Sequence, residues 1–172
     1  MKKRDYLRPD ELERLLAAAG RTRNPERDYA ICLVAFRHAL RVSELCGLKL
    51  SDVNVELGEI YIRRCKGSVS GSHPIYNGES QALNAWLAVR AEMNVLAYVD
   101  TLFVSEQRKP LNRVSIWYLT KGLAQEAGLE GIHPDSLRHS TGYHLTNQSS
   151  LAIGSEEPTT PWLFSGSITA RW

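Results

Sequence analysis

The sequence has no apolar run long enough to cross a membrane, because its longest such run lies within residues 30–35. A membrane-spanning helix needs about 20 consecutive apolar residues. The basic residues at the start of the chain are followed by no apolar stretch of the kind that a secretion signal contains. We therefore expect a cytoplasmic protein that has no membrane partner.

Cysteines and glycine-rich loops are also scarce. The chain has three cysteines, an odd number without the spacing of metal ligands, at Cys32, Cys46 and Cys65. Reduced, buried thiols are typical of such cysteines in a cytosolic protein. The sequence contains no glycine-rich phosphate loop of the nucleotide-binding type. It therefore predicts no metal site and no cofactor.

The chain also lacks a large excess of one charge, and its formal net charge of +2 does not by itself indicate nucleic acid. Basic proteins bind DNA through local patches, so clustering matters more than the total. The length of 172 residues, with 43% hydrophobic and 23% charged residues, is ordinary for one soluble globular domain. A domain of this size can bury a sizeable core.

What the sequence does contain is helical periodicity. Apolar residues recur at spacings of three and four over most of the chain. Helices are predicted at residues 9–19, 26–40, 43–48, 80–93, 112–128 and 134–147. Their apolar positions are predicted to form the core, and these include Trp86, Trp117 and Tyr118.

A stretch between the predicted helices has the period of a β-strand instead. Ile60 and Ile62 alternate with Tyr61 and Arg63. The segment rich in Gly and Ser after them predicts a hairpin loop. The loop is placed at residues 67–72, its partner strand at 73–76, and shorter strands at 52–59 and 101–104. The predicted fold class is mainly α with a small antiparallel β-sheet (α+β), formed by residues 1–148, and residues 149–172 are an atypical tail without a sustained period.

Three segments carry charged residues that are candidates for chemistry. Arg41 follows a predicted buried helix, and Glu44 is close enough in sequence to pair with it. Lys66 lies beside a glycine in the predicted hairpin, and Arg138 lies one helical turn after Asp135. Taken singly, each has an ordinary structural interpretation. These are an ion pair at Arg41, a solvated basic hairpin at Lys66, and an ion pair between Asp135 and Arg138.

Taken together and in this order, the three segments resemble the tyrosine recombinase (phage integrase) family. The motifs are Arg41-Val42-Ser43-Glu44-Leu45, then Lys66 in a hairpin, then Leu137-Arg138-His139-Ser140, and the resemblance covers residues 7–148. The pattern looks most like the small invertases of fimbrial phase variation, which flip fimbrial promoters. The resemblance implies the catalytic-domain fold of that family, incomplete at the C-terminus, and a role in site-specific DNA recombination or DNA integration.

The family's chemistry assigns a role to each of these residues. A tyrosine replaces a phosphodiester bond of DNA by a phosphotyrosine bond, and another strand then reverses the step. The resemblance implies that Arg41 and Arg138 clamp the non-bridging phosphate oxygens, where negative charge builds up in the transition state. It also implies that Lys66 protonates the leaving 5′ oxygen as a general acid.

The chain departs from the family in two places. Asp135 stands where the family usually has a histidine, and a carboxylate there weakens a phosphate site. No Leu-Gly-His segment follows Gln148, and residues 149–172 contain no tyrosine to act as the nucleophile. Tyr143 lies on the same predicted helix as Arg138 but on another face. We therefore expect an inactive member of this enzyme lineage, and a frameshift near codon 148 is a hypothesis that reading the other two frames would test.

Contacts to DNA phosphates are expected from basic residues outside the clamp. These are Lys2, Lys3, Arg4, Arg63, Arg64, Arg108, Lys109 and Arg113. If they converge on one face, binding to double-stranded DNA weakens steeply as salt is added. The expected partners are double-stranded DNA and, in a homo-oligomer or a mixed oligomer, further copies of this chain or an intact recombinase.

Three other interpretations stay open at this point. A non-catalytic DNA-binding regulator of inversion would occupy recombination sites without cutting them. A non-functional gene fragment would expose core surface and aggregate. A helical protein-interaction module would require Arg41 and Arg138 to lie far apart.

Overall fold

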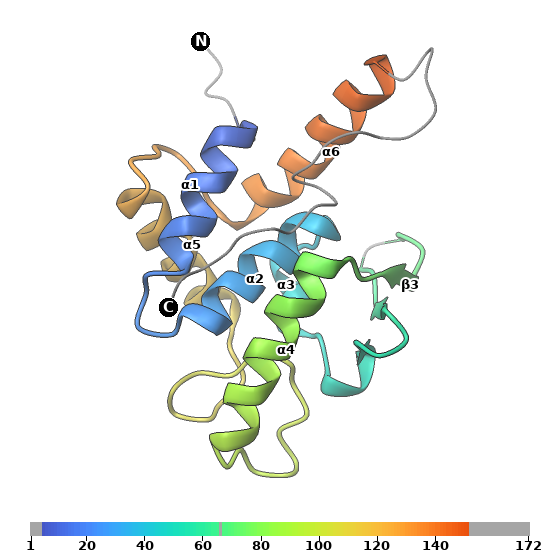
Figure 1. The fold of residues 1–172 in the computed structure, drawn as a ribbon, viewed down its shortest axis with the longest axis vertical. Coiled ribbons are helices and arrows are strands. Elements are labelled where there is room, and N and C mark those ends of the chain that lie inside the picture. Colours follow the sequence, from blue (N-terminus) through green and yellow to red (C-terminus); the bar gives the residue numbers. More distant parts are fainter. Residues whose placement is uncertain (1–4, 66, 152–172) are drawn as a thin grey trace.

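The computed structural model describes the backbone of residues 5–65 and 67–151, and the side chains of these stretches as far as residue 145. The helices of these stretches are α1 (Pro9–Ala19), α2 (Pro25–Arg37), α3 (Val42–Cys46), α4 (Asn77–Glu92), α5 (Arg113–Glu126) and α6 (Pro134–Leu151). A short 3-10 helix and three strands lie between α3 and α4, namely η1 (Leu50–Asp52), β1 (Val53–Asn54), β2 (Glu59–Ile62) and β3 (Gly71–Pro74). Figure 1 shows the longer helices gathered around α2, with the strands to one side. The predicted fold class is confirmed.

The core is built around α2, which packs against α1, α4 and α6. Every residue from Ala30 to Phe36 is buried, so this part of α2 has no polar face. A helix that is apolar all round must be covered on all sides. Trp86 of α4 is also buried, stacks on Phe103, and donates from its indole nitrogen to the Leu102 carbonyl at 2.9 Å. The core position predicted for Trp86 is therefore confirmed.

The sheet has the strand order β1–β2–β3 and is antiparallel throughout. Ile60 pairs with His73 and Ile62 pairs with Gly71. Both isoleucines are fully buried, whereas Tyr61 between them is exposed. The alternation of apolar and polar residues that predicted a strand therefore reflects a sheet with one face buried and the other exposed.

Helix α2 ends at Arg37, earlier than predicted, because the chain turns sharply at Ala39. Ala39 has a φ of 50°, in the left-handed region. The Leu40 N–H donates to the Ala35 carbonyl at 3.0 Å, and the Ala39 N–H donates to the Phe36 carbonyl at 3.2 Å. These are the two bonds of a Schellman motif, which usually has glycine where Ala39 stands. Without that glycine, the sequence pattern predicted the helix to continue.

Other boundaries also differ from the prediction. Helix α4 begins at Asn77, so Tyr76 is its N-cap and not part of a strand, and β3 begins inside the predicted loop. The predicted strand at 101–104 consists of two isolated bridges, in which Thr101 pairs with Lys49 and Val104 pairs with Pro110. Helix α6 continues through residue 151. Residues 152–172, most of the predicted tail, lie outside the described residues.

The core positions predicted for Trp117 and Tyr118 are wrong. Their exposed fractions are 41% and 66%. The two rings lie edge to face against each other, and the Lys121 ammonium lies 4.7 Å from the centroid of the Trp117 ring. Helical spacing therefore placed these rings on α5 correctly but did not tell which face of α5 is covered.

The cysteines are all free thiols, as predicted, but only Cys32 is fully buried. Burial raises the pKa of Cys32 to about 12, and burial also raises the pKa of half-buried Cys46. No helix among the described residues has the length and apolar character of a membrane span. No group of three or more His, Cys, Asp or Glu side chains in residues 5–65 and 67–145 is arranged to hold a metal ion.

The segment before α1 is fixed to α6 through both polar backbone groups of Leu7. The Leu7 N–H donates to Ser140 Oγ at 2.7 Å, and the Leu7 carbonyl lies 3.0 Å from His144 Nε2. Leu7 is fully buried, so these bonds satisfy backbone groups that water cannot reach. The start of the chain and α6 are therefore held together by polar as well as apolar contacts.

His144 makes the stability of this contact depend on pH. Burial lowers the pKa of His144, against the hydrogen bond to Leu7, which raises it. Because the folded pKa lies below the unfolded value of about 6.5, the unfolded chain binds the proton more tightly. Full stability is thus present above about pH 6.5 and is lost as the pH falls below it. Urea denaturation at several pH values measures this loss, which should be smaller in His144→Gln; an identical pH dependence in the variant would contradict the assignment.

Candidate functional site

The two segments that carry Arg41 and Arg138 meet at the C-terminal end of α2. Arg41 follows the turn that ends α2 and is the N-cap of α3. Arg138 lies on α6, which packs against α2. Thr141, one turn after Arg138, donates a hydrogen bond from its hydroxyl to the carbonyl of Phe36 near the end of α2. The fold therefore brings the segment that carries Arg138 to the end of α2 that Arg41 follows, although the two segments are far apart in sequence.

The guanidinium group of Arg138 lacks a partner on one side. Its Nη1 atom is buried and has no hydrogen-bond partner within the described residues. An arginine stays charged in a protein, and a buried donor without an acceptor is costly. Such a group is suited to an acceptor that comes from outside the chain, and an anion is the natural one.

The guanidinium group of Arg41 is anchored on one side. Its Nη1 donates to Glu44 Oε1 at 3.0 Å and to the carbonyl of Cys65 at 3.2 Å. The predicted ion pair between Arg41 and Glu44 is confirmed. Among the described residues these bonds use one of the three guanidinium nitrogens, and 29% of the side chain is exposed. Arginine has five donors in a planar fork, so Arg41 is held in place with donors left for a ligand.

Glu44 is the buried centre of this arrangement. It accepts from the N–H of Arg41 at 2.9 Å and of Cys65 at 3.0 Å, and from the guanidinium groups of Arg41 and Arg64 at 3.0 and 3.1 Å. Burial raises the pKa of Glu44, but these donors lower it, and the net pKa lies below the ordinary value. The carboxylate is therefore ionised at neutral pH and fixes the position of Arg41.

Arg64 connects the hairpin to the same place. Its guanidinium group donates to the carbonyls of His38 at 2.7 Å and Ala39 at 3.2 Å, in addition to Glu44. Arg64 was predicted to contact DNA, but its side chain is only 13% exposed and serves as an internal anchor. Lys66, the predicted general acid, lies outside the described residues. Its neighbour Cys65 contacts both Arg41 and Glu44 through backbone atoms.

Asp135 lies at the start of α6 and is exposed. The ion pair between Asp135 and Arg138, one of the sequence-based alternatives, is not among the ion pairs of the described residues. His133, the histidine nearest to Asp135 in sequence, pairs through Nε2 with Asp5 Oδ1 at 2.9 Å. The local i,i+3 spacing thus predicted the pair at Arg41 correctly and the pair at Arg138 wrongly.

Asp5 forms a cluster that sequence reasoning missed. It lies 2.6 Å from His139 Nδ1 as well as 2.9 Å from His133, and accepts from Ser136 Oγ at 3.0 Å. Burial raises the pKa of Asp5, but the hydrogen bonds of Ser136 and His139 and the nearby histidine charges lower it, and the net pKa is below the ordinary value. More than 125 residues separate Asp5 from these partners in sequence, so no local spacing could have revealed the cluster.

Within the described residues, the other side chains predicted to contact DNA lie on separate segments. Arg63 is half-exposed but forms an ion pair with Asp52. Arg108 and Lys109 are exposed on the loop between α4 and α5. That loop is fixed to the opposite end of α2, where Asn24 donates to Glu106 at 2.8 Å. Figure 1 shows this yellow loop far from α6.

The length of α2 separates Arg108 and Lys109 from Arg41. Helix α2 has 13 residues, which corresponds to a length of about 20 Å. Arg108 and Lys109 therefore do not share a single phosphate site with Arg41. Arg113, at the start of α5, is exposed, and Lys2, Lys3 and Arg4 lie outside the described residues.

Comparison with known proteins supports the resemblance seen in the sequence. The model of the Phage integrase family matches residues 5–152. The type 1 fimbriae regulatory protein FimB of Escherichia coli K12 is 39% identical over 147 residues, which is 85% of this chain and 73% of that protein. The regulatory protein FimE of the same strain is 34% identical over 149 residues, 86% of this chain and 75% of that protein. The predicted similarity to the fimbrial proteins is confirmed.

Solved structures of recombinases share the fold. The crystal structure of XerA recombinase superposes with a TM-score of 0.72 at 30% identity, over 94% of this chain and 56% of that one. XerH recombinase bound to its difH substrate has a TM-score of 0.71 at 23% identity, over 87% of this chain and 45% of that one. The chain thus spans about three quarters of the fimbrial proteins and about half of the Xer recombinases.

Proposed function

Because the chain belongs to the phage integrase family, the family of the tyrosine recombinases, we propose that it binds double-stranded DNA and holds one backbone phosphate between Arg41 and Arg138. One observation carries this proposal. The buried Nη1 of Arg138 has no partner within the described residues, and Arg138 lies on α6, which packs against α2 near the turn that leads to Arg41. A phosphate oxygen supplies the missing acceptor and the opposite charge.

The proposed site works by preorganised electrostatics. Glu44 holds Arg41 before DNA arrives, so the guanidinium group loses little freedom on binding. Arg138 is held on a rigid helix rather than on a loop. In a cleaving enzyme, two such groups stabilise the negative charge that builds up on the phosphate oxygens. Lys66 has the general-acid role in this proposal, as the resemblance implies.

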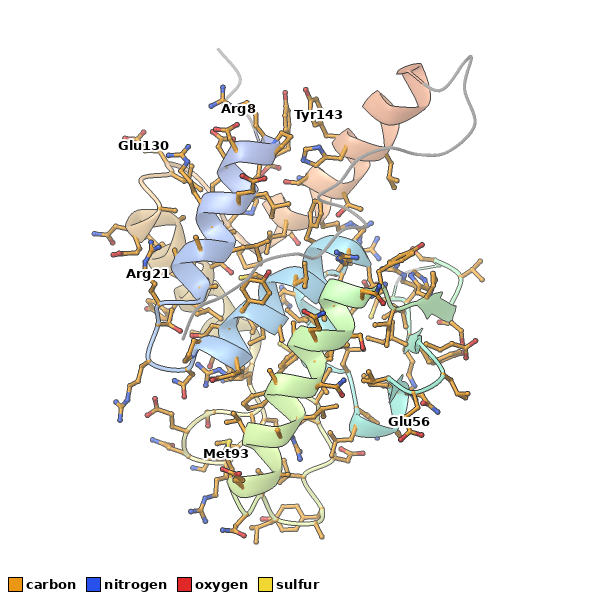
Figure 2. The ribbon with its side chains drawn as sticks, in the orientation of Figure 1. Arg8, Arg21, Glu56, Met93, Glu130 and Tyr143 are labelled. Carbon is orange, nitrogen blue, oxygen red and sulfur yellow. The ribbon has the colours of Figure 1, made fainter. Side chains whose placement is uncertain are left out.

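We also propose that this 172-residue chain binds DNA without cleaving it. Tyr143 is the tyrosine nearest to Arg138 in sequence, but five positions along a helix rotate a side chain by about 140°. Its ring stacks on Tyr6, with centroids 3.9 Å apart and an interplanar angle of 18°. Figure 2 shows Tyr143 on the side of α6 near the start of α1. Tyr143 is therefore assigned a packing role.

A regulator of inversion is the biological role that fits such a chain. The fimbrial relatives are themselves named regulatory proteins. XerH is described on its difH substrate, and λ integrase as a dimer bound to a core site. By analogy we propose that this chain occupies a recombination site, alone, with further copies, or with an intact recombinase. The helical interaction module is disfavoured, because the segments of Arg41 and Arg138 meet.

Two measurements on the purified chain test this function. Its affinity for a short synthetic DNA duplex should fall steeply with salt, with a slope on a logarithmic plot of about −0.9 per phosphate contact. A nicked suicide duplex should yield no covalent protein–DNA adduct. Absence of binding even at low salt would disprove the DNA-binding part of the proposal. Any covalent adduct formed by the purified chain would disprove the absence of cleavage, and Tyr143→Phe would show whether Tyr143 forms it.

A further inference from the structure

His38 is a buried residue at the end of α2 that links three elements. Its Nε2 lies 2.6 Å from Glu79 Oε1 on α4, and its Nδ1 lies 3.3 Å from His73 Nδ1 on β3. Glu79 is fully buried. The two imidazole rings meet edge to face, with centroids 5.3 Å apart. His38 is more than 30 positions from both His73 and Glu79 in sequence, and none of the three belongs to the proposed phosphate site.

The backbone of His38 also takes part. Its carbonyl accepts from Arg64 Nη2 at 2.7 Å. Arg64 lies on the outgoing arm of the hairpin, and His73 lies on the returning arm. Both arms are therefore fastened to His38, one through its carbonyl and one through its ring. The outgoing arm continues into Cys65, whose carbonyl accepts from Arg41.

The contact between the two rings limits how many protons they can hold. A hydrogen bond between two Nδ1 atoms contains one proton, which either ring can donate. His38 can donate from Nε2 to Glu79 in both cases. If both imidazoles are protonated, two N–H groups face each other and the bond is lost. The contact therefore persists with one positive ring in the pair but not with two.

Several charged groups surround the pair. Glu79 faces it from α4 and Arg64 faces it from the hairpin, and the charge of Glu79 is in turn faced by Arg37 of α2. Burial lowers the pKa of His73, His38 and Arg64 lower it further, and Glu79 acts in the opposite direction. Because the folded pKa of His73 is below the unfolded value of about 6.5, the neutral His73 ring is favoured in the folded chain, and the cost of protonating it appears only as the pH falls below that value.

We propose that His38 is a positioning residue for Arg41. His38 holds both arms of the hairpin through its contacts with Arg64 and His73. It releases the returning arm when the imidazoles of His38 and His73 are both protonated. The inference rests on the proposed function only where it concerns DNA. The hairpin contacts themselves exist in the free protein. Release of the returning arm removes one support of the outgoing arm, whose Cys65 carbonyl helps to fix Arg41, and so weakens the proposed phosphate site without any change in Arg41 or Arg138.

Hydrogen–deuterium exchange of the hairpin backbone in the free chain tests the inference directly. After correction for the intrinsic effect of pH, exchange in residues 59–74 should accelerate as the pH falls below about 6.5. His73→Phe keeps a ring but removes the hydrogen bond, so its exchange should be about 5-fold faster at neutral pH, as for a lost bond of ordinary strength. His73→Gln supplies an amide that does not titrate, so its exchange should stay slow at both pH values.

The control is His133→Gln, which changes a histidine outside the hairpin and should keep the wild-type response. Equal exchange in wild type, His73→Phe and His73→Gln at every pH would overturn the inference. DNA affinity, measured in parallel, should fall with acid pH more in wild type than in His73→Gln, and an equal fall in both would also overturn it. Failure of the wild type to bind DNA at any pH would instead overturn the proposed function, and the exchange data would still decide the positioning role.

Discussion

Replacement of Arg138 by Gln is expected to weaken binding of the chain to a DNA duplex by about 10- to 100-fold, the range for losing a hydrogen bond between charged groups. The same change should leave the free energy of unfolding unchanged or slightly higher. The reason is that Arg138 Nη1 is buried without a partner in the described part of the chain, so removing it relieves a cost in the free protein. Titration of labelled DNA and urea denaturation measure the two quantities.

The combination separates a binding role from a structural one. Arg21 is an exposed arginine in the turn between α1 and α2, and Figure 2 shows it at the opposite end of α1 from Tyr143 of α6. Arg21→Gln removes the same charge and serves as the matched control, with an expected loss of affinity of less than about 3-fold. If Arg138→Gln binds DNA like Arg21→Gln but unfolds more easily, then Arg138 has a structural role and the proposed clamp is wrong.

Replacement of Glu44 by Gln is expected to lower the free energy of unfolding by about 3 kcal/mol, the scale for breaking a buried ion pair. All four donors around Glu44 point at its two oxygens. The amide nitrogen of Gln places a donor against donors and leaves Arg41 and Arg64 without their carboxylate. Urea denaturation at neutral pH measures the loss.

Glu106 provides the control for this prediction. It is an exposed carboxylate that pairs with Arg23 at 3.2 Å. Exposed pairs contribute about 1 kcal/mol or less, so Glu106→Gln should have little effect. A loss below about 1 kcal/mol in Glu44→Gln would show that the buried carboxylate does not organise the site.

The parts of the fold that could be predicted from sequence depend on local signals. The apolar positions of α2 and the alternation at Ile60 and Ile62 are short-range patterns, and each identified its element. The end of α2 was missed because Ala39 adopts a left-handed conformation that sequence rules assign to glycine. Trp117 was misplaced because periodicity does not reveal which face of a helix is covered.

The candidate site likewise contains local contacts that the sequence predicts and distant contacts that it does not. The pair of Arg41 and Glu44 is an i,i+3 contact and could be predicted, whereas the role of Arg64 depends on carbonyls at the end of α2. The fold alone shows that His38 reaches Glu79 and His73, and that Asp5 reaches α6. The proposal that Arg41 acts together with Arg138 comes from the family resemblance, because no local pattern links the two residues.

A double-mutant cycle on DNA affinity tests the central claim most directly, with Arg41→Gln, Arg138→Gln and the double variant measured against the same duplex. Two groups that bind one phosphate depend on each other, so the loss in the double variant should fall short of the sum of the single losses by more than about 0.5 kcal/mol. Losses that add to within that amount would mean that the two arginines act at separate places, and would contradict the account.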